Sequence, residues 1–221
     1  MAVGTETPRS GDERARFAVA RGGPAAWRGL DFVTLAMLGV AFGVAFWAWD
    51  VLLYPFVKLA LVFPPLMSLT LGVWLLPCVV GMLIVRRPGA AVFIECIAAF
   101  VEMALGNEWG AMVMVSATLQ GLGVEAAFAL FRWRRAGVSV AILGGFLAAV
   151  VEIAGYEWWV YQVEYAWVWR FVSLGAAAVS GVLIAGCGGW SIMRALASTG
   201  ALRALPAGRD ALQQPGLDCR H

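Results

Sequence analysis

The sequence predicts an all-α, polytopic membrane protein with six transmembrane helices and both termini in the cytoplasm. Three observations support this prediction: an apolar composition, six long apolar runs and an uneven distribution of positive charge. Of the 221 residues, 62% are hydrophobic and only 14% are charged, and the mean hydropathy is +0.80. A soluble domain of this length would carry about 25% charged residues to cover its surface. The composition therefore indicates an integral membrane protein.

The predicted transmembrane helices are runs of about 20 mostly apolar residues, the length that crosses the hydrocarbon core of a bilayer. Arg, Pro, Gly or acidic residues separate one run from the next. The first lies between Arg28 and Asp50, the second starts at Pro64, and Gly106 ends the third. In chain order the six runs cover 29–49, 64–85, 89–106, 109–131, 137–158 and 167–193. They form a membrane domain over 29–195 that leaves no room for a separate soluble domain.

Positive charge gathers on one predicted face of the membrane. Only Lys58 and Arg170 fall on the opposite face. Because cations are retained on the cytoplasmic side, both termini are predicted to be cytoplasmic and the number of spans is predicted to be even. The 14 cations of the cytoplasmic face are Arg9, Arg14, Arg16, Arg21, Arg28, Arg86, Arg87, Arg132, Arg134, Arg135, Arg194, Arg203, Arg209 and Arg220.

The segments outside the membrane domain read as cytoplasmic tails. Residues 1–28 are rich in Gly, Arg and polar side chains, and they are predicted to be disordered. A signal peptide would place its apolar region earlier and a small-residue cleavage site after it. Residues 196–221 are predicted to form a C-terminal tail of the same kind.

Several classes of chemistry are excluded by residues that the chain lacks. The only histidine is His221, so neither a His-based triad nor a multi-histidine metal site can form in the membrane, and no metal or cofactor is expected. The chain has no phosphate-binding G-x-x-x-x-G-K-[ST] loop, so it is not predicted to hydrolyse ATP by itself. A net charge of only +2 argues against a nucleic-acid partner. No two of the four cysteines form a C-x-x-C pair. They are predicted to be packing residues, except for one thiol in the C-terminal tail.

Five polar residues remain inside the predicted helices: Glu95, Glu102, Gln120, Glu125 and Glu152. Carboxylates in the hydrocarbon are costly, so they normally face the bundle interior or a cavity. Seven residues bring Glu102 back to within about 20° of Glu95 on one helix face. By depth, Glu102 and Glu152 belong to an outer layer, and Glu95 and Glu125 to an inner one.

Aromatic and polar side chains also gather at the predicted outer ends of the helices. One interpretation is an interfacial aromatic belt, but the inner interface has few such residues beyond Trp27, Trp133 and Trp190. The other is an outward-facing pocket for a flat, weakly cationic small molecule that stacks on rings and donates to a carboxylate. The outer residues are Trp47, Trp49, Asp50, Tyr54, Asn107, Glu108, Trp109, Tyr156, Glu157, Trp158, Trp159, Tyr161, Glu164, Tyr165, Trp167 and Trp169.

The run from Arg86 to Arg135 closely resembles the core of YkoE-type S-components of energy-coupling factor (ECF) transporters. About 50 residues match densely, and the six-span layout fits across the remaining membrane domain. The matching features are Arg87-Pro88-Gly89-Ala90-Ala91, Glu95, Ala98-Ala99, Val101-Glu102, Gly106-Asn107, Gly110, Met112-Val113, Gln120-Gly121-Leu122-Gly123, Glu125-Ala126 and Phe128.

This resemblance implies a transport subunit of the bacterial cell membrane rather than an enzyme. S-components of this family bind thiamine or its hydroxymethylpyrimidine precursor from outside. They dock on a membrane coupling protein that carries two cytoplasmic ATPase subunits, and the S-component tilts to carry the vitamin inward. The small residues Gly39, Ala41, Gly43 and Ala45 resemble the face that meets the coupling protein, although they can equally pack inside the protein's own bundle.

The resemblance and the depth argument together predict the ligand site. Glu102 is expected to accept hydrogen bonds from the aminopyrimidine, with Asn107, Trp109 and Glu152 near it. Asn107 can alternatively be only the C-cap of its helix. Weaker candidates for stacking are Tyr156, Trp158 and Trp159. Glu95, Gln120 and Glu125 form either the cavity floor or a polar network that joins the third and fourth helices, and the Pro-interrupted segment 50–65 is a candidate lid.

Two other functions remain open at this point. A stand-alone secondary transporter or channel would pass protons or cations along Glu95, Glu102, Glu125 and Glu152. The absence of an internal repeat and the small size argue against it. A purely structural membrane subunit is the third option, but it leaves the buried polar groups unexplained.

Overall fold

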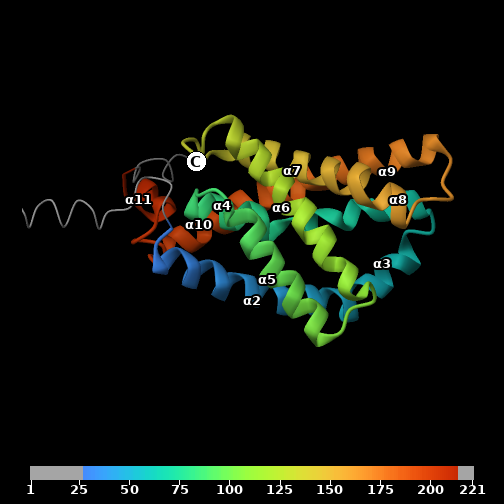
Figure 1. Ribbon diagram of the computed structural model, residues 1–221, viewed down its shortest axis with the longest axis horizontal. Helices are drawn as coiled ribbons and strands as arrows, with labels where there is room; N and C mark the ends of the chain where they lie inside the picture. The colour runs from blue at the N-terminus through green and yellow to red at the C-terminus, as the bar shows by residue number, and fades with distance from the viewer. Residues whose placement is uncertain (1–26, 214–221) are drawn as a thin grey trace, which may run out of the picture.

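The computed structural model describes residues 27–213, and this part of the chain is helical with no strand (Figure 1). The predicted tail 1–28 lies almost wholly outside the described residues. Among the helices, η1 and η2 are 3-10 and η3 and η4 are π-helical. In chain order the elements are α2 (Gly29–Leu52), α3 (Tyr54–Ala60), η1 (Pro64–Val73), α4 (Leu76–Val85), α5 (Ala90–Leu105), η2 (Gly110–Met112), α6 (Val113–Leu130), α7 (Val138–Glu152), η3 (Ile153–Glu157), α8 (Trp158–Val160), α9 (Trp167–Ser180), η4 (Gly181–Gly188), α10 (Gly189–Ser198) and α11 (Pro206–Gln213).

Five helical segments of the described chain are long and apolar enough to cross a membrane: Gly29–Leu52, Pro64–Val85, Gly110–Leu130, Val138–Val160 and Trp167–Ser198. Each coincides with one of the predicted runs. The remaining run, 89–106, is the helix α5, whose 16 residues span about 24 Å at a rise of 1.5 Å each. The prediction of an all-helical membrane protein is therefore confirmed, with five of its six spans recovered by length and composition.

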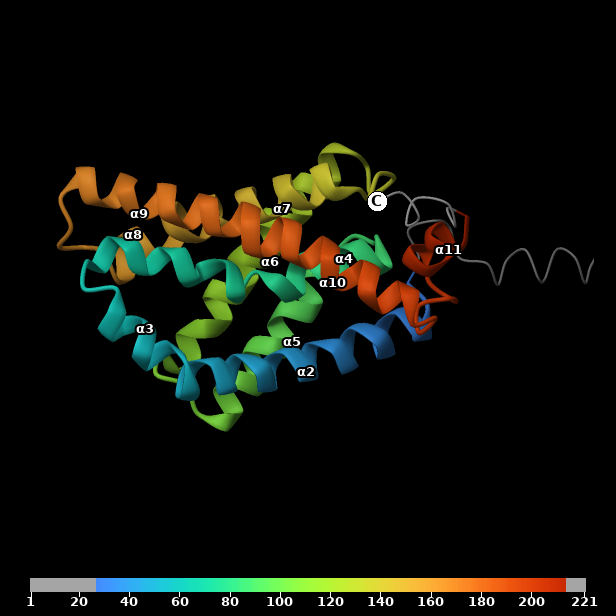
Figure 2. The same ribbon diagram turned by 180° about the vertical axis from the view of Figure 1, so that it is seen from behind.

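The helices pack in a bundle with two different ends. In Figures 1 and 2, α2 runs along one edge and α7 and α9 run along the opposite edge, while α5 and α6 lie between them. The start of α2 lies at the same end as α10 and α11, and α3 and α8 lie at the other end. Both ends of the described chain are therefore on one side of the bundle.

An ionic cluster holds the start of α2 against the loop between α4 and α5. Asp31 is fully buried and bonds Arg28 at 2.9 Å and Arg87 at 2.7 Å. Trp27 adds a hydrogen bond from its indole nitrogen to the carbonyl oxygen of Pro88, at 3.1 Å. These contacts join two of the basic segments that the sequence places on the same membrane face.

The C-terminal segment departs from the expected disordered tail. Residues 206–213 form α11, which packs against α4 and α10. Leu202 and Leu205 precede it and are buried, with 4% and 2% of their surfaces exposed. Apolar side chains that cover the end of α4 gain hydrophobic free energy on leaving water, which explains why this segment folds back.

Small residues let α2 approach α5 closely. An added Cβ at Gly43 would lie 2.5 Å from the carbonyl oxygen of Ala98, and one at Gly39 would lie 2.8 Å from Ile97 Cγ2. Gly39 and Gly43 are thus used for packing inside the bundle, which was one of the two interpretations of this stretch. Ala41 and Ala45 are exposed on another face of α2, so partner docking stays a prediction only for them.

We expect Gly43→Leu to destabilise the fold, because the new side chain would overlap the backbone of α5. Overpacking of this kind costs about 1–3 kcal/mol or more. The check is the midpoint of thermal unfolding in detergent, followed by circular dichroism. Ala41→Leu is the matched control, because that position on the same helix is exposed. Equal midpoints for the two variants would contradict the described packing of α2 on α5.

Candidate ligand-binding site

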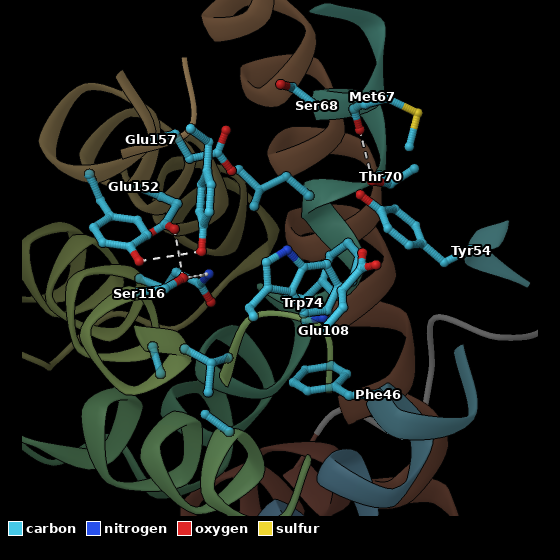
Figure 3. Close-up of a pocket in the computed structure, with 18 of the residues that line it drawn as sticks. Phe46, Tyr54, Met67, Ser68, Thr70, Trp74, Glu108, Ser116, Glu152 and Glu157 are labelled. Atoms are coloured by element: carbon cyan, nitrogen blue, oxygen red, sulfur yellow. Dashed lines mark hydrogen bonds between the residues drawn. The ribbon is translucent and has the colours of Figure 1, made fainter. Parts of the chain in front are cut away.

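A cavity of about 300 Å³ lies in the half of the bundle that carries α3 and α8, opposite the described termini. Its walls come from η1, α5, α6 and the end of α7 with η3, and α3 contributes to its rim. Figure 3 shows Glu152, Ser116 and Glu157 on one side of the cavity. Tyr54 and Trp74 lie on the opposite side. The cavity therefore has two walls of different composition.

Irregular helices position both walls. Pro64 and Pro65 begin η1, whose tight 3-10 coil ends at Val73, and α4 begins at Leu76 after a short turn. At the far wall α7 turns into the π-helical η3, which carries Tyr156 and Glu157 into the cavity lining. Such π-turns inside long helices are frequent at functional sites, because the extra residue per turn redirects side chains.

Six of the predicted residues line this cavity: Glu95, Glu102, Trp109, Gln120, Glu152 and Tyr156. Depth along the helices had separated the carboxylates into an outer and an inner layer. The structure instead brings Glu95, from the predicted inner layer, to the same cavity as Glu102 and Glu152. The carboxyl group of Glu95 therefore has Glu102 and Glu152 as neighbours.

The wall formed by α6 and α7 carries a short chain of hydrogen bonds. Gln120 Nε2 donates to Ser116 Oγ at 2.9 Å, and Ser116 Oγ donates to Glu152 Oε1 at 2.6 Å. Glu152 is buried, and its other oxygen, Oε2, has no partner. This wall therefore presents a fixed amide and a carboxyl oxygen that is still open to a donor from a ligand.

Glu102 dominates the opposite wall. It is fully buried, and neither of its carboxyl oxygens has a hydrogen-bond partner. Asp50, Asn107 and Trp74 are its polar neighbours. Both oxygens of Asp50 are likewise shielded and unpartnered. Polar groups buried without a partner cost several kcal/mol. A hydrogen-bond donor from a bound molecule would therefore stabilise this wall.

Three aromatic rings cluster at this wall, and one of them, Trp74, lies beside Glu102. Tyr54, Trp74 and Trp109 are in mutual contact, with centroid separations of 5.5 to 5.7 Å. Burial, together with the charges of nearby carboxylates, raises the pKa of Tyr54 to about 12, so its ring stays a neutral phenol. Edge and face contacts among such rings form a rigid platform with electron-rich faces.

An ion pair closes the rim above this aromatic group. Lys58 Nζ from α3 bonds both carboxyl oxygens of Glu108, at 2.6 and 2.8 Å, and lies 4.5 Å from the centre of the Tyr54 ring. Both partners are about half exposed, and both line the cavity. The pair ties α3 to the loop between α5 and α6. The segment predicted to act as a lid therefore does lie at the cavity mouth.

Two of the predicted carboxylates have clear structural partners. Glu125 accepts from the backbone N–H of Ala91 at 3.0 Å and from the indole of Trp133 at 3.2 Å, so it joins the start of α5 to α6 and its following loop. Glu95 accepts from the backbone N–H of Cys78 at 2.9 Å, near the start of α4. Glu95 thus combines the two roles considered for it, although its partner helix is α4 rather than α6.

Three other predicted residues lie outside the cavity lining. Trp158 donates to the carbonyl oxygen of Arg170 and packs on α9, and Trp159 is 62% exposed. They follow Tyr156 by only two and three residues, so the helix turns them away from the cavity. In this structure neither tryptophan lines the cavity. The third residue, Asn107, accepts a hydrogen bond from the backbone N–H of Gly110 through its Oδ1 and so caps the next turn. Its Nδ2 has no partner and lies beside Glu102.

Sequence reasoning missed several lining residues, among them Ser116 and Trp74. A signal for Ser116 was present, because it precedes Gln120 by four residues and so shares its helix face. Trp74 gave no such signal, since its position depends on the unusually long 3-10 segment before it. Tyr54 and Glu108 were among the aromatic and polar residues predicted at the outer ends of the helices, but they were not among the predicted ligand-binding residues.

The cavity is strongly acidic. Five glutamates line it, against a single lysine that is already engaged with one of them. Such a surplus of carboxyl groups in a confined, aromatic-walled space favours a ligand that is cationic or rich in hydrogen-bond donors. The geometry thus fits the chemical class predicted for the pocket.

Comparisons with known proteins agree with this picture. Residues 30–151 match the family described as "ABC-type cobalt transport system, permease component". The "Putative HMP/thiamine permease protein YkoE" of Bacillus subtilis (strain 168) is 32% identical over 193 residues, which cover 83% of this chain and 92% of the relative. A solved structure titled "Crystal structure of an S-component of ECF transporter" superposes with a TM-score of 0.79 at 30% identity, over 86% of this chain and 95% of the other. The chain therefore belongs to the family of YkoE-type S-components of ECF transporters.

Proposed function

We propose that this protein is the substrate-capture subunit of an ATP-driven ECF importer and that it binds thiamine or hydroxymethylpyrimidine in the cavity described above. The observation that carries the proposal is a buried, aromatic-walled cavity with carboxyl oxygens of Glu102 and Glu152 that lack partners. Its volume of about 300 Å³ lies at the lower end of the range for pockets that hold drug-sized ligands. The name of the Bacillus subtilis relative gives the ligand class.

The ligand-contacting residues in this proposal are Glu102, Trp109, Glu152 and Tyr156. An aminopyrimidine offers two amino hydrogens and ring nitrogen acceptors on a flat, polarisable ring. Carboxyl groups accept from the amino group, and aromatic side chains stack on the ring. Gln120 presents its amide from the neighbouring turn of α6. Glu95 supports the cavity floor by fixing α4 to α5.

The proposed orientation places the cavity on the outer side of the bacterial cell membrane. It rests on the basic loops at the end of the bundle that carries both described termini, because cations concentrate on the cytoplasmic side. In this arrangement α5 is the sixth membrane-spanning helix. Its place between α2 and α6, two of the candidate spans, supports that assignment.

The proposed partners are a transmembrane coupling protein and two ATPase subunits. The sequence has no nucleotide-binding loop of its own, so ATP hydrolysis would take place on those partners. Ala41 and Ala45 offer a small-residue stripe on the lipid-facing side of α2 where a partner helix can approach closely. Gly39 and Gly43 are not part of this surface, since α5 covers them.

Ligand binding is tested by tryptophan-fluorescence titration of purified protein, unfolded and refolded to remove carried-over ligand. We expect saturable quenching by thiamine or hydroxymethylpyrimidine and none by riboflavin. Glu102→Gln should weaken the binding of thiamine by about tenfold or more, because it removes an acceptor whose interaction with a cationic ligand is worth about 1.5–3 kcal/mol. Glu125→Gln is the matched control: it alters a carboxylate outside the cavity and should lower stability without changing the affinity.

A folded protein that responds to none of these ligands would contradict the proposed function. Loss of affinity in both variants to the same degree would contradict the role given to Glu102. In the first case, a secondary transporter that uses the same carboxylates becomes the leading alternative.

Energy coupling is tested by uptake of labelled thiamine into cells that express the protein with or without its coupling module. We expect uptake only when the coupling protein and both ATPases are present, and loss of uptake when an ATPase is inactivated. Uptake that persists without the module and follows the proton gradient would overturn the S-component role. Cells that express the coupling module without this protein serve as the control for background transport.

A further inference from the structure

The two walls of the cavity differ in chemistry. On the α6 and α7 side, Gln120, Ser116 and Glu152 form a directed chain of hydrogen bonds that ends in one open carboxyl oxygen. On the other side, Glu102 and Asp50 bring two carboxyl groups together without a backbone or basic side-chain donor, and Trp74 lies beside Glu102. One wall is therefore suited to matched donors and acceptors, and the other to positive charge.

In the described part of the protein, no basic side chain pairs with the carboxyl groups of the second wall. Asp50 lies on α2 directly beside the carboxyl group of Glu102, which lines the cavity. Lys58 is the nearest cation, but both oxygens of Glu108 hold it at 2.6 and 2.8 Å. Neither Asp50 nor Glu102 accepts a hydrogen bond from it. Two adjacent carboxyl groups in a site of low polarity do not both ionise, so they share one proton, and the single negative charge that remains attracts a cation.

The aromatic rings at the same wall favour a flat cation that can stack on them. Trp74 and Trp109 contact each other at 5.5 Å beside Glu102, and Tyr54 completes the group. Ring faces attract a flat cation through their quadrupole, even when it cannot donate a hydrogen bond. The wall thus fits a charged aromatic ring.

We infer that Asp50 is a specificity-determining residue of this protein: together with Glu102 it forms an anionic subsite for the cationic ring of a two-ring ligand. The neutral aminopyrimidine ring of that ligand then binds at the wall of Ser116, Gln120 and Glu152. This inference rests on the proposed function and refines it. It reverses the expected orientation, in which Glu102 held the aminopyrimidine. Asp50 acts through Glu102, because its own side chain does not line the cavity.

The inference predicts a preference among ligands of the proposed class. Thiamine has a cationic thiazolium ring joined to an aminopyrimidine and would occupy both walls. Hydroxymethylpyrimidine is a single neutral ring and would occupy only one. Pyrithiamine keeps a cationic ring in place of the thiazolium, and 3-deazathiamine replaces it with a neutral ring of similar shape. These four compounds separate the contribution of charge from that of shape.

The experiment is isothermal titration calorimetry of the full-length protein, stripped of ligand, with the four compounds. For the unmodified protein we expect 3-deazathiamine to bind at least about tenfold more weakly than thiamine, and pyrithiamine to bind like thiamine. Asp50→Asn should lower the affinity for thiamine and for pyrithiamine by about tenfold. It should change the affinity for hydroxymethylpyrimidine by less than about twofold. Ser116→Ala, the control at the other wall, should weaken all pyrimidine-containing compounds by similar factors.

Each result has one meaning. Equal affinities of the unmodified protein for thiamine and 3-deazathiamine would overturn the inference without any variant. The inference would also be overturned if Asp50→Asn lowered the affinity for hydroxymethylpyrimidine by the same factor as the affinity for thiamine. Asp50→Glu keeps the carboxyl group and should keep the preference for cationic ligands. This variant shows whether the effect of Asp50→Asn comes from the lost charge or from a disturbed structure. Failure of the unmodified protein to bind any of the compounds would instead contradict the proposed function itself.

Discussion

The arrangement of this molecule depends on carboxyl groups that lie among membrane helices without enough hydrogen-bond donors around them. Glu102 is fully buried and has no partner, and Glu152 has a donor for only one of its two oxygens. Retaining such groups costs several kcal/mol each, which the tight packing of the surrounding helices must offset. That packing is best seen where Gly43 of α2 meets the backbone of α5. A rigid scaffold thereby holds polar groups that are ready for a ligand.

The same cavity explains why several helices depart from regular α geometry. The 3-10 helix η1 and the π-helix η3 face each other across it, and both carry lining residues. At the other end of the bundle the buried groups are satisfied: Asp31 has two arginines, and Glu125 has a backbone N–H and an indole. The buried polar groups at one end therefore have partners, whereas several that line the cavity at the other end lack them, as the proposed ligand site requires.

The sequence predicted the helices well, because long apolar runs are a strong signal in a membrane protein. It also predicted Glu102 and Glu152, since a carboxylate in such a run stands out. Serine is common in membrane helices and does not stand out, so Ser116 was missed despite its contact with Glu152. The position of Trp74 and the folding back of α11 depend on tertiary packing that no local pattern records. Small residues on α2 predicted a close helix contact, but the identity of the neighbouring helix came only from the structure.

The most direct test of this account is a structure of the protein with thiamine bound. The account predicts density for the ligand in the cavity, with the thiazolium ring beside Glu102 and the aminopyrimidine within hydrogen-bonding distance of Glu152. Density with the two rings exchanged would preserve the substrate-capture role and contradict the anionic subsite formed with Asp50. An empty cavity at saturating thiamine, or density at another place on the protein, would contradict the central claim that this cavity is the ligand site.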